Sequence, residues 1–144
     1  MIVVADTSGI IAASDRKADD FAACRAVLQD AGTVVISPLV LTEVDHLAKA
    51  RFGSAARSAI IDFILEQAAI ERIVIPATGP EVLQPARAVQ RQYAGLDLDL
   101  ADAVNVILAA RHATRDLLTL DERDFRAIRP LTSHRWFRLL PHDQ

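Results

Sequence analysis

The chain is poor in the residues that cross-link small secreted proteins or bind zinc. Cysteine occurs once, as Cys24, so no internal disulfide can form. Apolar neighbours at helical spacing favour Cys24 as a small core residue rather than a nucleophile. The four histidines lack the spacing of metal ligands, which argues against zinc chemistry of the Cys/His type.

Long apolar runs are also missing. No run approaches the roughly 20 residues that a membrane-spanning helix needs. The longest candidate, residues 103–110, is interrupted by Asn105 and ends at Arg111. The N-terminal residues MIVVAD carry no basic segment before their apolar stretch, which argues against a signal peptide. These absences predict a cytoplasmic protein with no membrane association.

A strong excess of basic charge is absent too, since the net charge is −3. The charge is unevenly distributed, however. Residues 1–110 contain 9 basic and 14 acidic side chains, whereas residues 111–144 contain 7 arginines and 5 acids. An acidic centre beside an arginine-rich segment suits a metal-dependent nuclease, although an ordinary solvated surface would give the same totals.

The chain alternates between short strand-like and longer helix-like segments, and 51% of its 144 residues are apolar, enough for one sizeable core. Strands are expected over residues 2–5, 33–36, 73–75 and 117–120, with a last edge strand over 136–140. Helices are expected over residues 7–14, 20–30, 38–52, 54–69, 80–93, 100–112 and 122–128. Strands separated by helices predict a single α/β domain over residues 1–144. Its expected form is a three-layer α/β/α sandwich around a mostly parallel sheet.

Carboxylates follow two of the predicted strands. Asp6 comes directly after the first strand and Asp121 directly after the fourth. Ligands bind outside the carboxyl ends of the strands in open sheets of this kind, so both side chains are expected at the ligand-binding edge. Either aspartate could instead be a helix N-cap, a position that aspartate favours.

A third carboxylate, Glu43, lies on the helix expected over residues 38–52. The spacing of Leu39, Glu43 and Leu47 places it on a largely apolar face. A carboxylate facing the core must be paired, protonated or bound to a metal ion. The alternative is that Glu43 lies at the edge of the apolar face and reaches water.

Two further acids, Asp99 and Asp102, lie one turn apart at the start of the helix expected over residues 100–112. Asp99 could be the N-cap, and Asp102 could be a first-turn acid favoured by the helix dipole. Asp102 and Asn105 nevertheless share one face of a helix rich in valine, isoleucine and alanine, where buried polar groups need partners.

Carboxylates converging from separate segments would repel one another and raise their pKa values. A hard divalent cation with oxygen ligands removes that cost. Such an ion can activate water and stabilise charge on a phosphate, so the pattern favours Mg²⁺- or Mn²⁺-dependent phosphodiester hydrolysis.

Four segments then match a known pattern in order along the chain. They are Asp6-Thr7-Ser8 after a strand, Ser37-Pro38 with Thr42-Glu43 downstream, Leu100-Ala101-Asp102-Ala103, and Thr119-Leu120-Asp121-Glu122-Arg123-Asp124-Phe125. Over essentially the whole chain, their order and spacing resemble the PIN-domain family, in particular the VapC-type toxins of bacterial VapBC pairs.

The resemblance implies a three-layer α/β sandwich that binds Mg²⁺ or Mn²⁺ and acts as an endoribonuclease, the toxin component of a type II toxin–antitoxin system. Matched residue by residue, the metal-binding and catalytic set would be Asp6, Glu43, Asp102 and Asp121. Candidates to orient these ligands or their waters are Thr7, Ser8, Asp99, Asn105 and Asp124. Candidates to position the RNA backbone are Arg51, Arg111, Arg115 and Arg123.

The resemblance also implies partners. Toxins of this type are held inactive by a cognate VapB-type antitoxin, whose tail covers the active groove, and they commonly form homodimers. Their usual substrates are structured RNAs, with loops in tRNA or rRNA as targets. Because the chain has five phenylalanines, one tryptophan and one tyrosine, shape and arginine contacts are expected to matter more than base stacking.

Three other classes of function, namely Asp-dependent phosphotransfer, dinucleotide binding and non-catalytic interaction, fit the sequence less well. A phosphatase with an aspartate nucleophile would carry a second aspartate two residues after Asp6, where Ser8 stands, and a receiver domain would need a late lysine, whereas the two lysines are Lys17 and Lys49. A dinucleotide-binding domain would need a glycine-rich turn after the first strand. A catalytically silent interaction module would not need all four matched acids.

Overall fold

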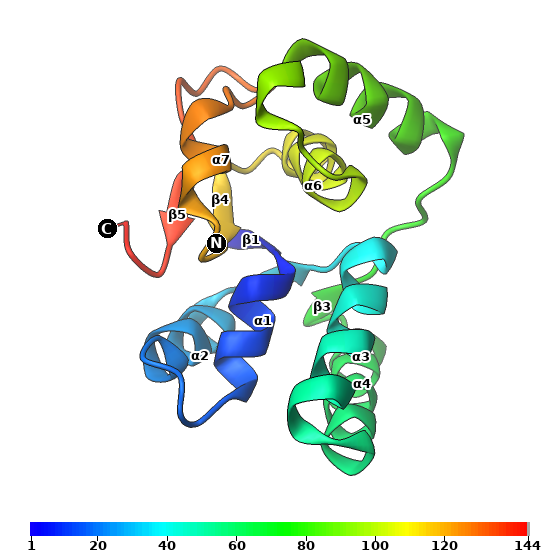
Figure 1. Ribbon diagram of the computed structural model, residues 1–144, viewed down its shortest axis with the longest axis vertical. Coiled ribbons are helices and arrows are strands. Elements are labelled where there is room, and N and C mark those ends of the chain that lie inside the picture. Colours follow the sequence, from blue (N-terminus) through cyan, green and yellow to red (C-terminus); the bar gives the residue numbers. More distant parts are fainter. Residues whose placement is uncertain (144) are drawn as a thin grey trace.

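The computed structural model describes residues 1–143 and contains one five-stranded sheet (Figure 1). The strands are β1 (Ile2–Ala5), β2 (Thr33–Val35), β3 (Ile73–Val74), β4 (Asp116–Leu118) and β5 (Arg138–Leu140). Their order in the sheet is β3-β2-β1-β4-β5, and every neighbouring pair is parallel. β1 therefore lies at the centre, with β2 and β4 on either side.

Helices cover both faces of the sheet. They are α1 (Thr7–Ser14), α2 (Phe21–Asp30), α3 (Pro38–Phe52), α4 (Ser54–Ala69), α5 (Pro80–Gln92), α6 (Leu100–Arg111) and α7 (Glu122–Ala127), with a 3₁₀ turn at Ala94–Leu96. In Figure 1, α1 to α4 lie below the sheet and α5 and α6 lie above it. The predicted three-layer α/β/α sandwich is confirmed.

Alternation along the strands divides the core in two. Val3 and Ala5 of β1 pack with α1 to α4, whereas Val4 packs with α5 and α6. The same alternation places Leu118 in the first cluster and Leu117 in the second. Because successive strand residues point to opposite faces, strands buried on both sides have continuous apolar sequences.

Local signals explain where α3 begins. The Ser37 hydroxyl accepts hydrogen bonds from the Leu39 and Val40 amides, and Pro38 occupies the first turn of α3, as the sequence predicted.

Cys24 is fully buried in α2, which confirms its place in the core. Within residues 1–143, no helix is both long and apolar enough to cross a membrane.

Four strands are shorter than expected, and β2 and β3 each end one residue early, at Val35 and Val74. β4 ends at Leu118 rather than at residue 120, because the chain turns after Thr119 toward α7. β5 begins at Arg138 rather than at residue 136, because its ladder with β4 starts where the Arg138 amide bonds the Arg115 carbonyl. Trp136 therefore lies outside the sheet.

Candidate active site

The two strand-terminal aspartates meet at the carboxyl edge of the sheet, as the sequence predicted. β1 and β4 are neighbours with Ala5 opposite Leu118, and the Asp6 amide donates to the Leu118 carbonyl at 2.9 Å. Asp6 occupies the N-cap position of α1, but its side chain makes no capping hydrogen bond. Its carboxylate is therefore available to other partners.

Asp6 is nearly inaccessible, with 6% of its surface exposed. Its Oδ2 accepts a 2.9 Å hydrogen bond from the Thr119 hydroxyl, and its Oδ1 accepts a 3.4 Å bond from Nδ2 of Asn105. Burial raises the pKa of Asp6 to about 6, and the charges of Glu43 and Asp121 add to the rise. A cation at this position would remove the cost of ionising Asp6.

Thr119 connects the ends of β1 and β4, and the sequence reasoning missed this role. Besides donating to Asp6, its hydroxyl accepts from the Asp121 amide at 3.0 Å and lies 3.3 Å from the Ser8 hydroxyl. Ser8 in turn accepts from the Leu120 amide at 2.9 Å. Thr119 thus orients Asp6 and the chain leading to Asp121. No local signal could have identified it, because Thr119 falls within the strand expected over residues 117–120 and its partner Asp6 is 113 residues away.

Asp102 projects from the first turn of α6 toward the same edge. Its amide donates to Oδ1 of Asp99 at 2.8 Å, so Asp99 is the N-cap of α6. Burial raises the pKa of Asp102 to about 8, and the charges of Asp6 and Asp99 contribute next. Asp99 therefore serves as a cap and also adds negative charge beside Asp102.

Three carboxylates approach closely enough to share one ion. Single oxygens of Asp102, Asp121 and Asp124 all lie within 4.8 Å of one another. The pKa of Asp121 is raised by burial and by the charges of Asp124 and Asp99. The sequence reasoning treated Asp124 as an accessory acid, whereas the structure places it beside Asp102 and Asp121. Clustered carboxylate oxygens are the donors that Mg²⁺ and Mn²⁺ prefer, so these residues fit such an ion.

Glu43 lies at the edge of the buried stripe of α3. The buried stripe of α3 consists of Val40, Val44 and Ala48, and Leu47 is 36% exposed. Glu43 flanks this stripe and is half-buried, so of the two positions that the sequence left open, the edge of the apolar face is the observed one. Both rows have a spacing of four residues, so the spacing alone does not distinguish the buried row from the adjacent one.

Glu43 nevertheless reaches the carboxyl edge of the sheet. Its Oε1 accepts a 3.3 Å hydrogen bond from the Thr7 hydroxyl, one residue after Asp6. Its pKa is raised by burial and by the charge of Asp99. The charge of Glu43 therefore interacts with the charges of the aspartates at this edge.

Asn105 has a buried oxygen atom that a ligand at the site could satisfy. It is 1% exposed, and its Oδ1 has no hydrogen-bond partner within residues 1–143. A buried acceptor without a partner is costly, and a water molecule held at the site could satisfy it.

The four arginines proposed for RNA contact are not together. Arg123 lies close enough to Asp121 to lower the pKa of that carboxyl, in opposition to the rise that burial causes. Arg111 lies at the far end of α6 and donates to the Glu81 carbonyl. Arg51 lies near the end of α3, and Arg115 directly precedes β4 at the opposite edge of the sheet. The structure thus places one of the four, Arg123, beside the carboxylates.

Known proteins are similar to this chain in sequence and in fold. The family model described as PIN domain matches residues 3–130. The chain is 34% identical to ribonuclease VapC26 of Mycobacterium tuberculosis (strain ATCC 25618 / H37Rv) over 140 residues, which cover 96% of this chain and 100% of that protein.

Two solved structures are similar in fold, each with 16% sequence identity. One is the sarcin-ricin loop cleaving toxin VapC20 of Mycobacterium tuberculosis, with a TM-score of 0.74 over 84% of this chain and 91% of that one. The other is VapBC2 from Rickettsia felis bound to a DNA fragment from its promoter, with a TM-score of 0.65 over 89% of this chain and 93% of that one.

Proposed function

The chain belongs to the PIN-domain family, and from that premise we propose that it is a metal-dependent endoribonuclease, the toxin of a type II toxin–antitoxin pair. Its substrates would be structured RNAs, such as loops of tRNA or rRNA. The observation that carries the proposal is the approach of the Asp102, Asp121 and Asp124 oxygens to within 4.8 Å, beside buried Asp6. The 34% identical relative, a ribonuclease matched over its full length, supports the same activity.

The carboxylates would have different roles in metal binding. Asp6 and Asp102 would hold the principal Mg²⁺ or Mn²⁺, and Asp121 and Glu43 would hold its waters or a second ion, with Asp124 in support. The bound ion would supply positive charge against the scissile phosphate and a lower pKa for the attacking water. Thr119 and Asn105 would keep the Asp6 carboxylate aimed by their hydrogen bonds.

A side chain with a raised pKa would accept the proton of the attacking water. Glu43 is half-buried, is oriented by the Thr7 hydroxyl and has a raised pKa, so it could accept a proton from the attacking water. Asp121 has the same direction of shift and could share this role. Arg123, beside Asp121, would contact the RNA backbone and position it without reading sequence.

Cleavage of total RNA by the purified protein tests the proposal. We expect discrete fragments with Mg²⁺ or Mn²⁺, none with EDTA, and none with Asp102→Asn. Mapping the fragment ends would identify the target. Cleavage that survives both EDTA and the substitution would contradict the proposed site. Absence of both cleavage and metal binding would favour a catalytically silent interaction module.

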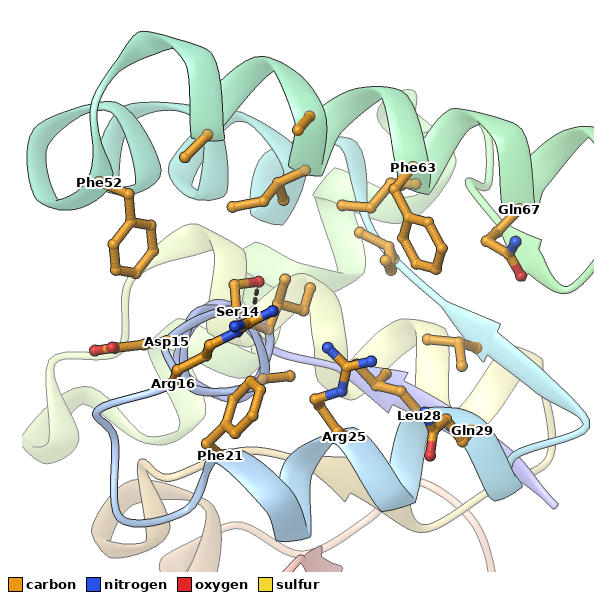
Figure 2. A pocket seen from close by; sticks show the side chains of 18 of the residues that line it. Ser14, Asp15, Arg16, Phe21, Arg25, Leu28, Gln29, Phe52, Phe63 and Gln67 are labelled. Carbon is orange, nitrogen blue, oxygen red and sulfur yellow. Dashed lines mark hydrogen bonds between the residues drawn. The ribbon is translucent and has the colours of Figure 1, made fainter.

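The proposal includes a VapB-type antitoxin as partner, and a groove of about 1130 Å³ between α2 and α4 supports it (Figure 2). Apolar side chains of α4, including Phe63 (58% exposed), point into the groove, and Arg25 of α2 points in from the other side. Five basic residues and one acid, Asp15, line it. This chemistry suits an amphipathic helix with acidic flanks.

Co-purification with a co-expressed VapB-type antitoxin would test this surface. Phe63→Ser combined with Arg25→Glu should release the antitoxin, whereas Arg91→Glu on α5 should not. Loss of binding only on substitution of the site carboxylates would instead place the contact over the active site.

A homodimer is also expected, and sedimentation equilibrium of the isolated chain would measure its mass in solution.

A further inference from the structure

The sole tryptophan of the chain is exposed on a loop. Trp136 lies between α7 and β5 with 60% of its surface accessible, although the next residue, Phe137, is buried. An indole left in water offers a large, rigid contact area to a ligand. Trp136 lines a shallow pocket of about 310 Å³ together with Arg115, Arg126, Arg138 and Asp143, which we term the Trp136 pocket.

The guanidinium groups of this pocket differ in their partners. Arg126 is bound to both carboxylate oxygens of Asp143, at 2.6 and 2.8 Å. Arg138 is bound to both oxygens of Asp116, at 2.8 Å each. Within residues 1–143 the Arg115 side chain has neither a hydrogen bond nor an ion pair. One unneutralised guanidinium therefore stands beside an exposed indole.

The segment around the pocket is basic. Residues 125–143 contain four arginines and two histidines against one acid, Asp143. The chain as a whole has a net charge of −3, so this concentration of positive charge is local. A local basic surface on an acidic protein attracts polyanions to that place.

We propose that the Trp136 pocket binds single-stranded RNA, with a base stacked on the Trp136 indole and a phosphate held by Arg115. The inference rests on the proposed function, which makes RNA the substrate. Every base has a π face, so stacking on an aromatic side chain tolerates any sequence. Arginine contributes charge to a phosphate and releases counterions.

The position of the pocket determines its effect. Arg115 directly precedes β4 and Asp121 lies beyond its far end, and the three residues of the strand alone span about 10 Å. A structured RNA can reach both places at once, but the reacting phosphate would not touch the pocket. The pocket would therefore increase affinity for RNA and leave the cleavage step unchanged, so its loss should raise KM and not lower kcat.

A second copy of the chain fits this surface less well. A two-fold contact places each surface against itself, which would bring Arg115 and its basic neighbours opposite the same residues of the partner. Like charges facing each other oppose such an association. An RNA strand carries the complementary charge.

The fluorescence of Trp136 tests the proposal directly, because no other tryptophan contributes. Asp102→Asn protein, which should not cut RNA, is titrated with polyuridylate and separately with heparin, a polyanion without bases. Stacking should quench the emission with polyuridylate, whereas heparin should compete for the site without comparable quenching. Anisotropy of a fluorescein-labelled oligouridylate then gives affinities for the variants in the same background.

We expect Trp136→Leu to weaken oligouridylate binding about tenfold, the effect of losing one stacked base. Arg115→Gln should weaken it severalfold and make the slope of log affinity against log salt shallower by about one. Arg91→Gln, the same charge change on α5, is the control and should leave both values unchanged. In the wild-type chain, Trp136→Leu should raise KM for the cleaved RNA at constant kcat.

Other results would overturn the inference. Unchanged emission with polyuridylate, or equal binding by wild type and Trp136→Leu, would exclude stacking. Emission that changes on dilution of the protein but not with RNA would assign the pocket to a contact between copies. Metal-dependent cleavage by the wild type, measured separately, would keep the proposed function in place in either case.

Discussion

The Thr119 hydroxyl donates a 2.9 Å hydrogen bond to Oδ2 of Asp6, joining residues 113 positions apart at the centre of the carboxylate site. Both residues are buried, so water does not replace this bond if it is lost. The same hydroxyl accepts from the Asp121 amide. The geometry of two proposed metal ligands therefore depends on one uncharged side chain.

Thr119→Val should weaken metal binding while keeping the volume of the side chain. Removing the hydroxyl takes one hydrogen bond from the Asp6 carboxylate and makes its ionised form less favourable. Loss of such a supporting bond typically costs 10- to 100-fold in metal affinity. Calorimetric titration with Mn²⁺ would measure it, with Thr119→Ser as the control that keeps the hydroxyl. Equal affinity in all three proteins would contradict the role assigned to Thr119.

Substitutions of Asp99 should separate its capping role from metal binding. Asp99→Ala removes the acceptor for the Asp102 amide and should lower the free energy of unfolding by about 1 kcal/mol. Asp99→Ser restores a capping oxygen and should recover most of that loss. Urea denaturation measures stability, and Mn²⁺ titration measures binding. If Asp99→Ser reduced metal affinity as severely as Asp102→Asn, Asp99 would be a ligand as well as a cap.

The stability of the metal-free protein should fall as pH rises from about 4 to 8. The pKa values of Asp6 and Asp102 are raised in the folded state to about 6 and about 8, from the ordinary value of 3.8. In this window the folded state holds more protons than the unfolded state, so the stabilisation present below pH 4 is lost as pH rises.

Melting temperatures in EDTA across this pH range would test the linkage. The fall should be shallower for Asp102→Asn, which has no carboxyl to ionise at that position. Mg²⁺ added at pH 8 should restore the melting temperature of the wild type, because it binds the folded state. A wild-type profile that matches the variant at every pH would show that Asp102 does not carry the effect.

Gly9→Ala should destabilise the fold at the contact between α1 and β4. A Cβ on Gly9 would lie 2.5 Å from Cγ of Leu118 and 2.9 Å from its carbonyl oxygen, and the backbone of β4 cannot move freely. Overpacking of this kind costs about 1–3 kcal/mol, which urea denaturation can detect. Displacing α1 should also weaken the Ser8–Thr119 contact and reduce cleavage. Gly95→Ala, where a Cβ meets nothing within 4 Å, is the control.

Much of the architecture followed from local patterns. Apolar runs such as Ile2–Ala5, flanked by helical spacing, predicted the strands, and parallel order followed from the helices between them. Asp6 and Asp121 could be assigned to one edge of the sheet because each follows a strand. Their meeting required that β1 and β4 be neighbours, which no pattern in the sequence states.

The accessory residues depended on contacts that the sequence does not encode locally. Asp99 caps α6 through a local contact that the sequence already allowed, whereas Asp124, also at a helix start, lies beside Asp102 and Asp121 only because of the fold. Trp136 was expected to begin a strand, but it lies outside the sheet and exposed. Each outcome depends on which neighbouring element fills the space around the side chain.

The sequence by itself thus determined the helices and strands, the fold class, and the two aspartates, Asp6 and Asp121, that follow strands. It could do so because helical and strand periodicities act over a few residues. Only the tertiary structure decided that Thr119 supports Asp6, that Glu43 flanks the buried stripe of α3, and that Asp124 lies among the metal-binding candidates. Such contacts arise when crossover helices bring distant strand ends together, and their geometry depends on the packing of the whole sheet.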